Sequence, residues 1–81
     1  MTRADVFDLV KKNLLDILPD LDPERVDEKT SMKDLGANSI DRADVVVRSM
    51  EELGIKLKIS ELAEVKDLAG LVDILSEKAS L

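Results

Sequence analysis

The sequence predicts an all-α fold: a small bundle of three main helices and one short helix, with a long loop between the first and second helices. Apolar residues recur at helical spacing in three separate segments of the chain. The chain contains one aromatic residue, Phe7, so its core has to be built from Leu, Ile, Val and Met, which favours packed helices. A length of 81 residues suits one domain, which we expect to span residues 1–81.

The first helix is expected from Ala4 to Leu18, where apolar residues fall on one face at helical spacing. Thr2 followed three residues later by Asp5 resembles a capping box with Asp in place of Glu. Pro19 then ends the helix. The residues predicted to face the core are Val6, Phe7, Val10, Leu14, Ile17 and Leu18.

The segment 19–38 has no sustained period and contains turn-forming residues, so it is predicted to be a long loop. Val26, Met32 and Leu35 are expected to attach it to the core. A stretch of roughly 20 residues without a long element is unusual in so small a domain, and such loops often carry function. Asp20, Asp22 and Glu24 have a spacing that suggests a calcium-binding loop. Such a loop needs Gly after the third ligand, and Arg25 occupies that position, so a calcium site is rejected.

The second half of the chain predicts three further elements. A helix is expected over Ser39–Leu53, with Gly54 as its C-cap. Residues 55–59 alternate apolar and basic side chains and are predicted to form an extended connector, followed by a single capped helical turn over residues 60–64. Asp67 is expected to cap the last helix. The residues of that helix predicted to point inward are Leu68, Leu71, Val72 and Leu75.

Composition excludes several classes of function. The chain has 18 acidic and 12 basic residues, a formal net charge of −6, so its surface repels nucleic acid and anionic lipid and attracts basic patches on partners. It has no Cys and no His, which removes disulfides, thiolate chemistry, the commonest general base and the commonest metal ligand. We therefore expect neither an enzyme nor a metal site.

No apolar run approaches the length of a transmembrane helix, and the first residues turn acidic at once, without a signal-peptide core. We expect a soluble, cytoplasmic protein that is a monomer and binds neither membranes nor nucleic acid.

The junction between the long loop and the second helix is the most informative part of the chain. Gly36 permits a sharp turn, Asn38 is a strong N-cap residue, and Asp41 stands where it can reach back as in a capping box. If Asn38 caps the helix, the hydroxyl of Ser39 is free at a helix N-terminus, where backbone amides and the helix dipole favour a phosphate. On local chemistry alone, the favoured interpretation is that Ser39 simply begins a helix, with Asn38 or Ser39 as an ordinary cap, because Gly-x-Asn-Ser before a helix is common.

Residues 34–41, Asp-Leu-Gly-Ala-Asn-Ser-Ile-Asp, resemble the attachment motif of acyl carrier proteins, usually Asp-Leu-Gly-x-Asp-Ser-Leu-Asp. The resemblance extends over nearly the whole chain. It implies that Ser39 carries a covalent 4'-phosphopantetheine, installed from coenzyme A by a phosphopantetheinyl transferase. Acyl groups are then held as thioesters on the terminal thiol of this arm. Asn38 and Ile40 depart from the usual motif, and Asn38 removes a charge beside the phosphate.

The longer segment 36–45, Gly-Ala-Asn-Ser-Ile-Asp-Arg-Ala-Asp-Val, is similar to the free-standing donor carrier proteins of β-branching cassettes in bacterial polyketide biosynthesis. This resemblance implies an acetyl cargo, sometimes propionyl, and docking on an HMG-CoA-synthase-like enzyme. It also implies loading by an acyltransferase and a decarboxylating ketosynthase-like enzyme. Alternatives are a generic polyketide or fatty-acid carrier, a peptidyl or aminoacyl carrier, and a helical interaction module without a prosthetic group.

The second helix has a broad apolar arc of about 220°, where a single core-facing stripe needs only somewhat more than 100°. Resemblance to carrier proteins places Val45, Val46, Ser49 and Leu53 inward. It places Ile40 and Val47 outward, with Met50 as a further candidate for the outward face. The alternative is a helix buried on two sides by its neighbours. Arg42 and Arg48 interrupt the acidic residues of this helix. They can serve as specificity elements, as members of helical salt pairs such as that of Asp44 with Arg48, or as both. The predicted partner-binding residues are Asn38, Ile40, Asp41, Arg42, Asp44, Val47, Arg48 and Met50.

Overall fold

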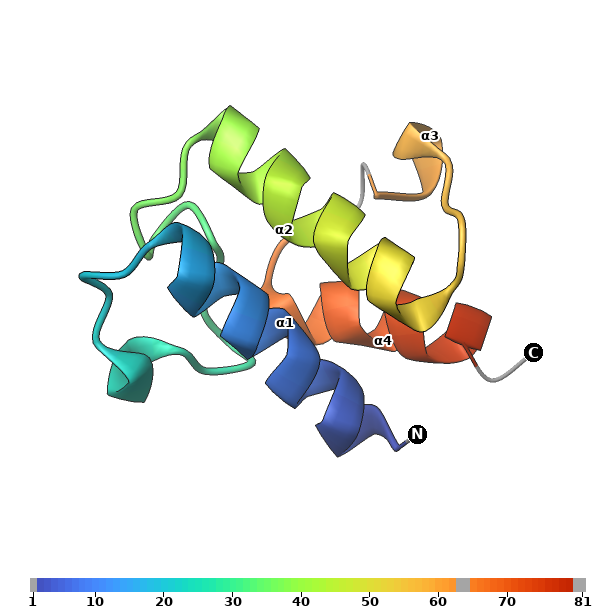
Figure 1. Cartoon of the computed structure of the whole chain (residues 1–81), viewed down its shortest axis with the longest axis horizontal. Helices are drawn as coiled ribbons and strands as arrows, with labels where there is room; N and C mark the ends of the chain where they lie inside the picture. Colours follow the sequence, from blue (N-terminus) through green and yellow to red (C-terminus); the bar gives the residue numbers. More distant parts are fainter. Residues whose placement is uncertain (1, 63–64, 80–81) are drawn as a thin grey trace.

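The computed structural model describes residues 2–62 and 65–79, and the regular elements among them are all helical (Figure 1). Three main helices are α1 (Arg3–Ile17), α2 (Ser39–Leu53) and α4 (Leu68–Ala79). A 3₁₀ turn, η1 (Pro23–Arg25), interrupts the long connection, and α3 (Ile59–Leu62) is one short turn. The predicted all-α class, helix order and long loop are confirmed, and α2 has the predicted bounds.

Two of the predicted boundaries differ slightly from the structure. Helix α1 begins one residue before Ala4 and ends one residue before Leu18. Helix α3 begins at Ile59 rather than Ser60, and the end of the predicted short turn, residues 63–64, lies outside the described residues.

Helix α1 packs against both α2 and α4, so the core lies between these three helices (Figure 1). The predicted inward face of α4 is buried in full. On α1, the centre of the predicted face is buried, whereas Phe7, Ile17 and Leu18 are only half-buried at its edges. Full burial of each aliphatic side chain contributes about 1.5–3 kcal/mol. The buried apolar cluster consists of Val6, Val10, Leu14, Val26, Leu35, Val45, Leu68, Leu71, Val72 and Leu75.

The start of α1 has the predicted capping box. The Thr2 hydroxyl accepts a hydrogen bond from the Asp5 amide at 3.2 Å, and the Asp5 carboxylate accepts one from the Thr2 amide at 2.9 Å. The Thr2 amide, followed by the Thr2 hydroxyl, lowers the pKa of Asp5, because both stabilise the charged form. Two residues therefore satisfy amides that the first turn of a helix leaves unpaired.

The long connection is attached to the N-terminus of α4 through its backbone. The carbonyl of Glu28 accepts a hydrogen bond from the Ala69 amide at 2.8 Å, and the carbonyl of Thr30 accepts one from the Leu68 amide at 3.0 Å. The Asp67 carboxylate accepts one from the Gly70 amide at 2.9 Å, as predicted for a cap. The loop thus supplies partners that the first turn of α4 lacks.

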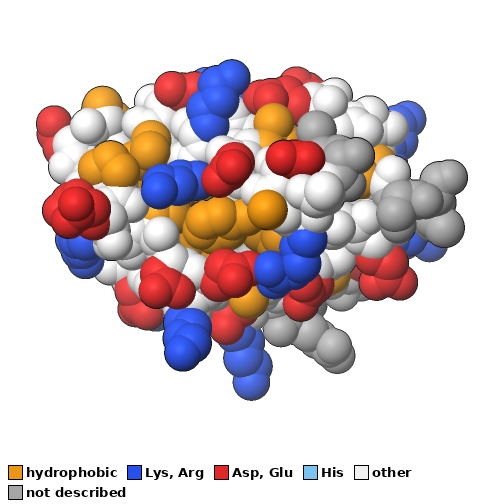
Figure 2. All heavy atoms as spheres, turned by 90° about the horizontal axis from the view of Figure 1, so that it is seen from below, with side chains coloured by type: hydrophobic (Ala, Val, Ile, Leu, Met, Phe, Trp, Pro, Cys, Tyr) orange, Lys and Arg blue, Asp and Glu red, His pale blue; other side chains and the backbone are white. Residues whose placement is uncertain are grey.

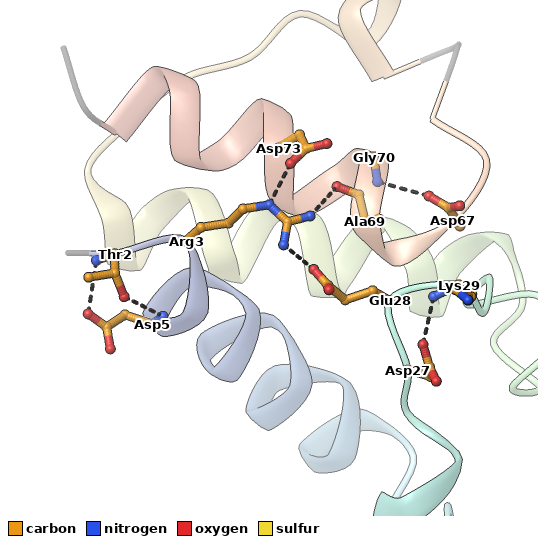
Figure 3. A network of polar contacts seen from close by, with 10 residues as sticks. All are labelled: Thr2, Arg3, Asp5, Asp27, Glu28, Lys29, Asp67, Ala69, Gly70 and Asp73. Carbon is orange, nitrogen blue, oxygen red and sulfur yellow. Dashed lines mark hydrogen bonds and ion pairs between the residues drawn. The ribbon is translucent and has the colours of Figure 1, made fainter.

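Arg3 joins three segments on the surface (Figure 3). Its guanidinium donates to Asp73 at 2.6 Å, to Glu28, and to the carbonyl of Ala69 at 3.4 Å. These groups are well exposed to solvent, so each pair contributes little to stability. The network nevertheless links the start of α1 to both the long connection and α4.

One polar pair lies inside the core, where α1 meets α2. The Asn13 side-chain amide donates to the Ser49 hydroxyl at 3.1 Å, and that hydroxyl donates to the Val45 carbonyl at 2.8 Å. Asn13 is 2% exposed and Ser49 is fully buried, so a shift of α2 along α1 leaves both groups unsatisfied. Ser49 was predicted to point inward, whereas the role of Asn13 was not predicted.

Helix α2 ends at Gly54, whose φ of 67° lies in the left-handed region. The Ile55 amide donates to the Met50 carbonyl at 3.0 Å and closes the end of the helix. Residues 55–58 form the predicted extended connector. Glu61 then holds α3 in place, because its carboxylate accepts from the Lys58 amide at 2.9 Å and pairs with Lys78 of α4 at 3.2 Å.

Replacing Gly54 or Gly70 by Ala should change the free energy of unfolding in opposite directions. Gly54→Ala should lower the free energy of unfolding by about 1 kcal/mol, because Ala disfavours a positive φ. Gly70→Ala should raise it by about 0.5 kcal/mol, because Ala favours the helix and its Cβ meets Asp67 Oδ1 at 3.4 Å, an ordinary contact. Urea unfolding of both variants measures the difference. A stability loss for Gly70→Ala as large as that for Gly54→Ala would contradict the assigned backbone conformations.

Candidate functional site

The turn that precedes α2 is held by its own backbone and by two buried side chains. The amide of Gly36 donates to the Lys33 carbonyl at 3.0 Å, and that of Ala37 donates to the Met32 carbonyl at 3.0 Å. Gly36 has a φ of 95°, which favours glycine. The side chains of Leu35 and Ala37 are buried on either side of it. The direction from which the chain enters α2 is therefore fixed.

Asn38 caps α2 as predicted. Its side-chain oxygen accepts from the Asp41 amide at 2.8 Å, and the Asp41 carboxylate accepts from the Asn38 amide at 3.3 Å. Since Asn38 and Asp41 complete the capping box between them, the hydroxyl of Ser39 has no capping role.

Ser39 is exposed at the first position of α2. Its hydroxyl oxygen accepts a hydrogen bond from Arg42 Nη2 at 3.2 Å. Among the described residues, the amides of Ser39 and Ile40 have no hydrogen-bond partner, so two donors point out of the helix end beside this hydroxyl. An accessible oxygen, free amides, the positive end of the helix dipole and a guanidinium together fit a phosphodiester attached at Ser39.

An apolar groove of about 580 Å³ begins at Ser39. One wall is α2, and the other includes Leu57 of the connector, Leu62 of α3 and Val65. The sequence did not predict this groove, because it depends on how the segment after Gly54 folds back beside α2. The groove is lined by Met32, Ser39, Arg42, Ala43, Val46, Val47, Met50, Leu57, Leu62, Val65 and Leu71.

A smaller hollow of about 160 Å³ lies on the other side of Arg42, between the long connection and the start of α4. Three basic side chains line it, those of Lys33, Arg42 and Lys66, together with Asp67. Arg42 thus stands at the boundary between an apolar groove and a basic hollow.

The orientation of α2 agrees with the placement that the carrier-protein resemblance implies. Val45 and Ser49 are fully buried, whereas Ile40 is 72% exposed and Val47 is 45% exposed. Val46 and Leu53, both predicted inward, are half-buried against the core. The alternative of a helix buried on two sides is wrong, because its outward face is open.

The other predicted partner residues fall into two groups. Asn38, Asp44 and Arg48 are exposed, and Asp44 and Arg48 form no ion pair in the described structure, so the predicted helical salt pair is absent. Asp41 and Arg42 are half-buried and hydrogen-bonded to Asn38 or Ser39. Met50, also half-buried, lines the apolar groove. The direction of the Arg42 side chain, back toward Ser39, was not predicted.

The face of the molecule on the side of α1 has a mixed charge pattern. Figure 2 shows acidic and basic side chains interspersed there, with small apolar areas between them. The negative net charge is therefore spread among charges of both signs and does not make a uniformly acidic surface on this face.

The described part of the chain, residues 2–62 and 65–79, lacks two kinds of feature. No helix there is long and apolar enough to cross a membrane. No cluster of three or more acidic, His or Cys side chains is placed to hold a metal ion in that part of the chain.

Residues 8–75 match the protein family described as the phosphopantetheine attachment site. The chain is 32% identical over 78 residues to the polyketide biosynthesis acyl-carrier-protein AcpK of Bacillus subtilis (strain 168), covering 96% of this chain and 95% of AcpK. It is also 32% identical over 78 residues to the acyl carrier protein of Caulobacter vibrioides (strain NA1000 / CB15N), covering 95% and 99% of the two chains.

A solved structure is similar over almost the whole chain. A chain in the crystal structure of the curacin biosynthetic pathway HMG synthase in complex with acetyl donor-ACP superposes with a TM-score of 0.87 and 31% sequence identity. The match covers 96% of this chain and 100% of the other. These comparisons favour a carrier over an interaction module without a prosthetic group.

The cap at Asn38 can be tested apart from any modification. Asn38→Ala should lower the free energy of unfolding by about 1 kcal/mol, because the Asp41 amide loses its partner. Asn38→Asp should retain most of the stability, since a carboxylate accepts the same hydrogen bond. Urea unfolding of the unmodified protein measures both. Equal losses for the two variants would show that the cap does not determine the stability of this helix end.

Proposed function

Since this chain belongs to the family of acyl carrier proteins with a phosphopantetheine attachment site, we propose that Ser39 is its attachment residue. The protein carries 4'-phosphopantetheine covalently, and it is a carrier and a substrate of enzymes rather than a catalyst. When bound, this group supplies a terminal thiol that holds an acyl chain as a thioester. The protein's own residues hold the attachment point and present a surface to partners.

The choice of Ser39 is supported by the geometry of the helix end. Asn38 and Asp41 keep the hydroxyl out of the capping box, and the turn at Gly36 leaves it exposed. By contrast, the hydroxyl of Ser49 is buried against Asn13. A transferase can therefore approach Ser39 without disturbing the core.

We further propose that the acyl group is acetyl, or another short acyl, and that it is delivered to an HMG-CoA-synthase-like enzyme for β-branching in polyketide biosynthesis. The observation that carries this proposal is the likeness to a chain in the HMG synthase complex with acetyl donor-ACP, which extends over nearly all of both chains. The similarity to AcpK supports polyketide biosynthesis as the setting.

The outward face of α2 is the proposed docking surface. At its centre are Ile40 and Val47, the two large apolar side chains that are exposed in the described residues. Neither side chain belongs to the buried core, so folding leaves their apolar surface exposed to water. Binding to a partner that buries this surface is therefore favourable. Arg48 and Asp44 lie exposed on the same helix, and charges of both signs allow wrong partners to be rejected by like-charge contacts. The full docking surface is Asn38, Ile40, Asp41, Arg42, Asp44, Val47, Arg48 and Met50.

Further parts of the proposal follow from the same family. A phosphopantetheinyl transferase modifies Ser39, and an acyltransferase and a decarboxylating ketosynthase-like enzyme load the acyl group. Residues 1–81 act as one monomeric domain in the cytoplasm. The second candidate function is that of a generic polyketide or fatty-acid carrier, which the similarity to the Caulobacter protein favours. Binding of the acetyl-loaded protein to an HMG-type synthase distinguishes the two.

Attachment at Ser39 is tested by intact mass after incubation with coenzyme A and a broad-specificity phosphopantetheinyl transferase. The wild type should gain one phosphopantetheinyl group, and Ser39→Ala should gain none. Ser60→Ala, which removes another exposed serine in a first helical turn, should be modified like the wild type. A folded wild type that gains no mass would overturn the assignment and leave the interaction module as the better interpretation.

Docking through α2 is tested by titrating the acetyl-loaded protein into an HMG-type synthase. Ile40→Ala should weaken binding about tenfold, because it truncates the most exposed apolar side chain of the docking surface. Lys12→Ala, an exposed truncation on α1, is the matched control and should bind like the wild type. Urea unfolding should give the same stability for Ile40→Ala as for the wild type. Unchanged affinity for Ile40→Ala would rule out this surface.

A further inference from the structure

Arg42 lies folded back along α2 onto the proposed attachment residue. Its Nη2 donates to Ser39 Oγ at 3.2 Å and its Nε donates to the Asn38 carbonyl at 3.4 Å. These two hydrogen bonds bring the guanidinium to the helix N-terminus, although its backbone lies three residues further along the chain.

The charge of Arg42 has no carboxylate partner in the part of the chain that the structure describes. The ion pairs found there join Arg3 to Glu28 and Asp73, and Lys78 to Glu61. Arg42 is half-buried in a protein with a net charge of −6, yet among the described residues its guanidinium donates hydrogen bonds only to a hydroxyl and a carbonyl. An unpaired guanidinium held in this way is well placed for an anion.

The position of Arg42 matches the chemistry of the attachment. Once Ser39 Oγ is esterified, phosphorus is bonded to the same oxygen that Nη2 now contacts. The planar guanidinium can then donate to the non-bridging phosphate oxygens, which are stronger acceptors than a hydroxyl. Asn38 adds no negative charge beside that phosphate.

The two hollows that Arg42 lines are consistent with a phosphate bound at its guanidinium. Lys33 and Lys66 line the basic hollow on one side of it, while the apolar groove begins on the other. A phosphate held by Arg42 is thus fixed at the boundary between the two, where the arm starts.

We propose that Arg42 binds the phosphodiester on Ser39 and thereby orients the first part of the prosthetic arm. This inference rests on Ser39 being the attachment residue, as proposed above. Arg42 consequently has two roles in sequence: it holds the hydroxyl in the unmodified protein and the phosphodiester in the modified one.

The test compares the unmodified and modified forms of the wild type and of Arg42→Gln, Arg42→Lys and Arg48→Gln. Each variant is loaded with excess transferase and its loading is verified by intact mass. Urea unfolding then gives the effect of attachment on the unfolding equilibrium constant of each variant. Arg48→Gln is the matched control, since it removes the same charge from an exposed position on the same helix.

Attachment changes the unfolding equilibrium constant of each variant. In Arg42→Gln this change should be about fivefold less stabilising than in the wild type, because the phosphate loses a charged donor. Arg42→Lys should recover part of the difference, and Arg48→Gln should match the wild type. The ³¹P resonance of the phosphodiester should move in Arg42→Gln and stay unchanged in Arg48→Gln.

The proposal is overturned if Arg42→Gln and Arg48→Gln respond alike to attachment and leave the ³¹P resonance at the wild-type position. That outcome leaves the assignment of Ser39 intact, because loading is measured separately. Failure of the wild type to gain mass at Ser39 would instead refute the proposed function on which this inference rests.

Discussion

The structure depends on how the long connection between α1 and α2 satisfies its backbone. Two carbonyls of this segment, those of Glu28 and Thr30, accept hydrogen bonds from the first two amides of α4. The same contact closes an irregular loop and completes a helix end, so neither is left with unpaired polar groups. With Val26 and Leu35 buried in the core, the loop has a fixed path, and that path determines where α2 begins.

The first amides of α2 and α4 differ in the hydrogen-bond partners that they find. At α4, the protein's own loop and Asp67 occupy the free amides. At α2, side chains within the first turn form a capping box, and the amides of Ser39 and Ile40 remain free among the described residues. The N-terminus of α4 thus connects the helix to the long loop. The N-terminus of α2 has the donors, the exposed hydroxyl and the nearby cation that a phosphodiester needs.

Local signals explain why much of the fold was predictable from the sequence. The bounds of α2 follow from Asn38 with Asp41 at one end and Gly54 at the other, and each of these acts within a few residues of itself. The hydrogen bond from Asn13 to Ser49 joins residues far apart in the sequence, and the apolar groove depends on how the segment after Gly54 folds back beside α2, so no local pattern indicates either. The apolar arc of α2 was too broad to orient the helix by its period, and the carrier-protein resemblance supplied the orientation. The direction of the Arg42 side chain depends on the three-dimensional position of Ser39.

Helix α2 has one face buried in the protein and an opposite face exposed to solvent. Val45 and Ser49 bury one face against the rest of the protein, and the buried polar pair with Asn13 fixes the helix along α1. The other face exposes Ile40 and Val47, which contribute little to the core. Because Ile40 and Val47 lie outside the buried cluster, substituting them should cost little stability, and on the proposed docking role it would change the choice of partner. On the proposal that Ser39 is the attachment residue and the outward face of α2 is the docking surface, this division keeps the attachment residue in a fixed place while the docking surface is free to vary.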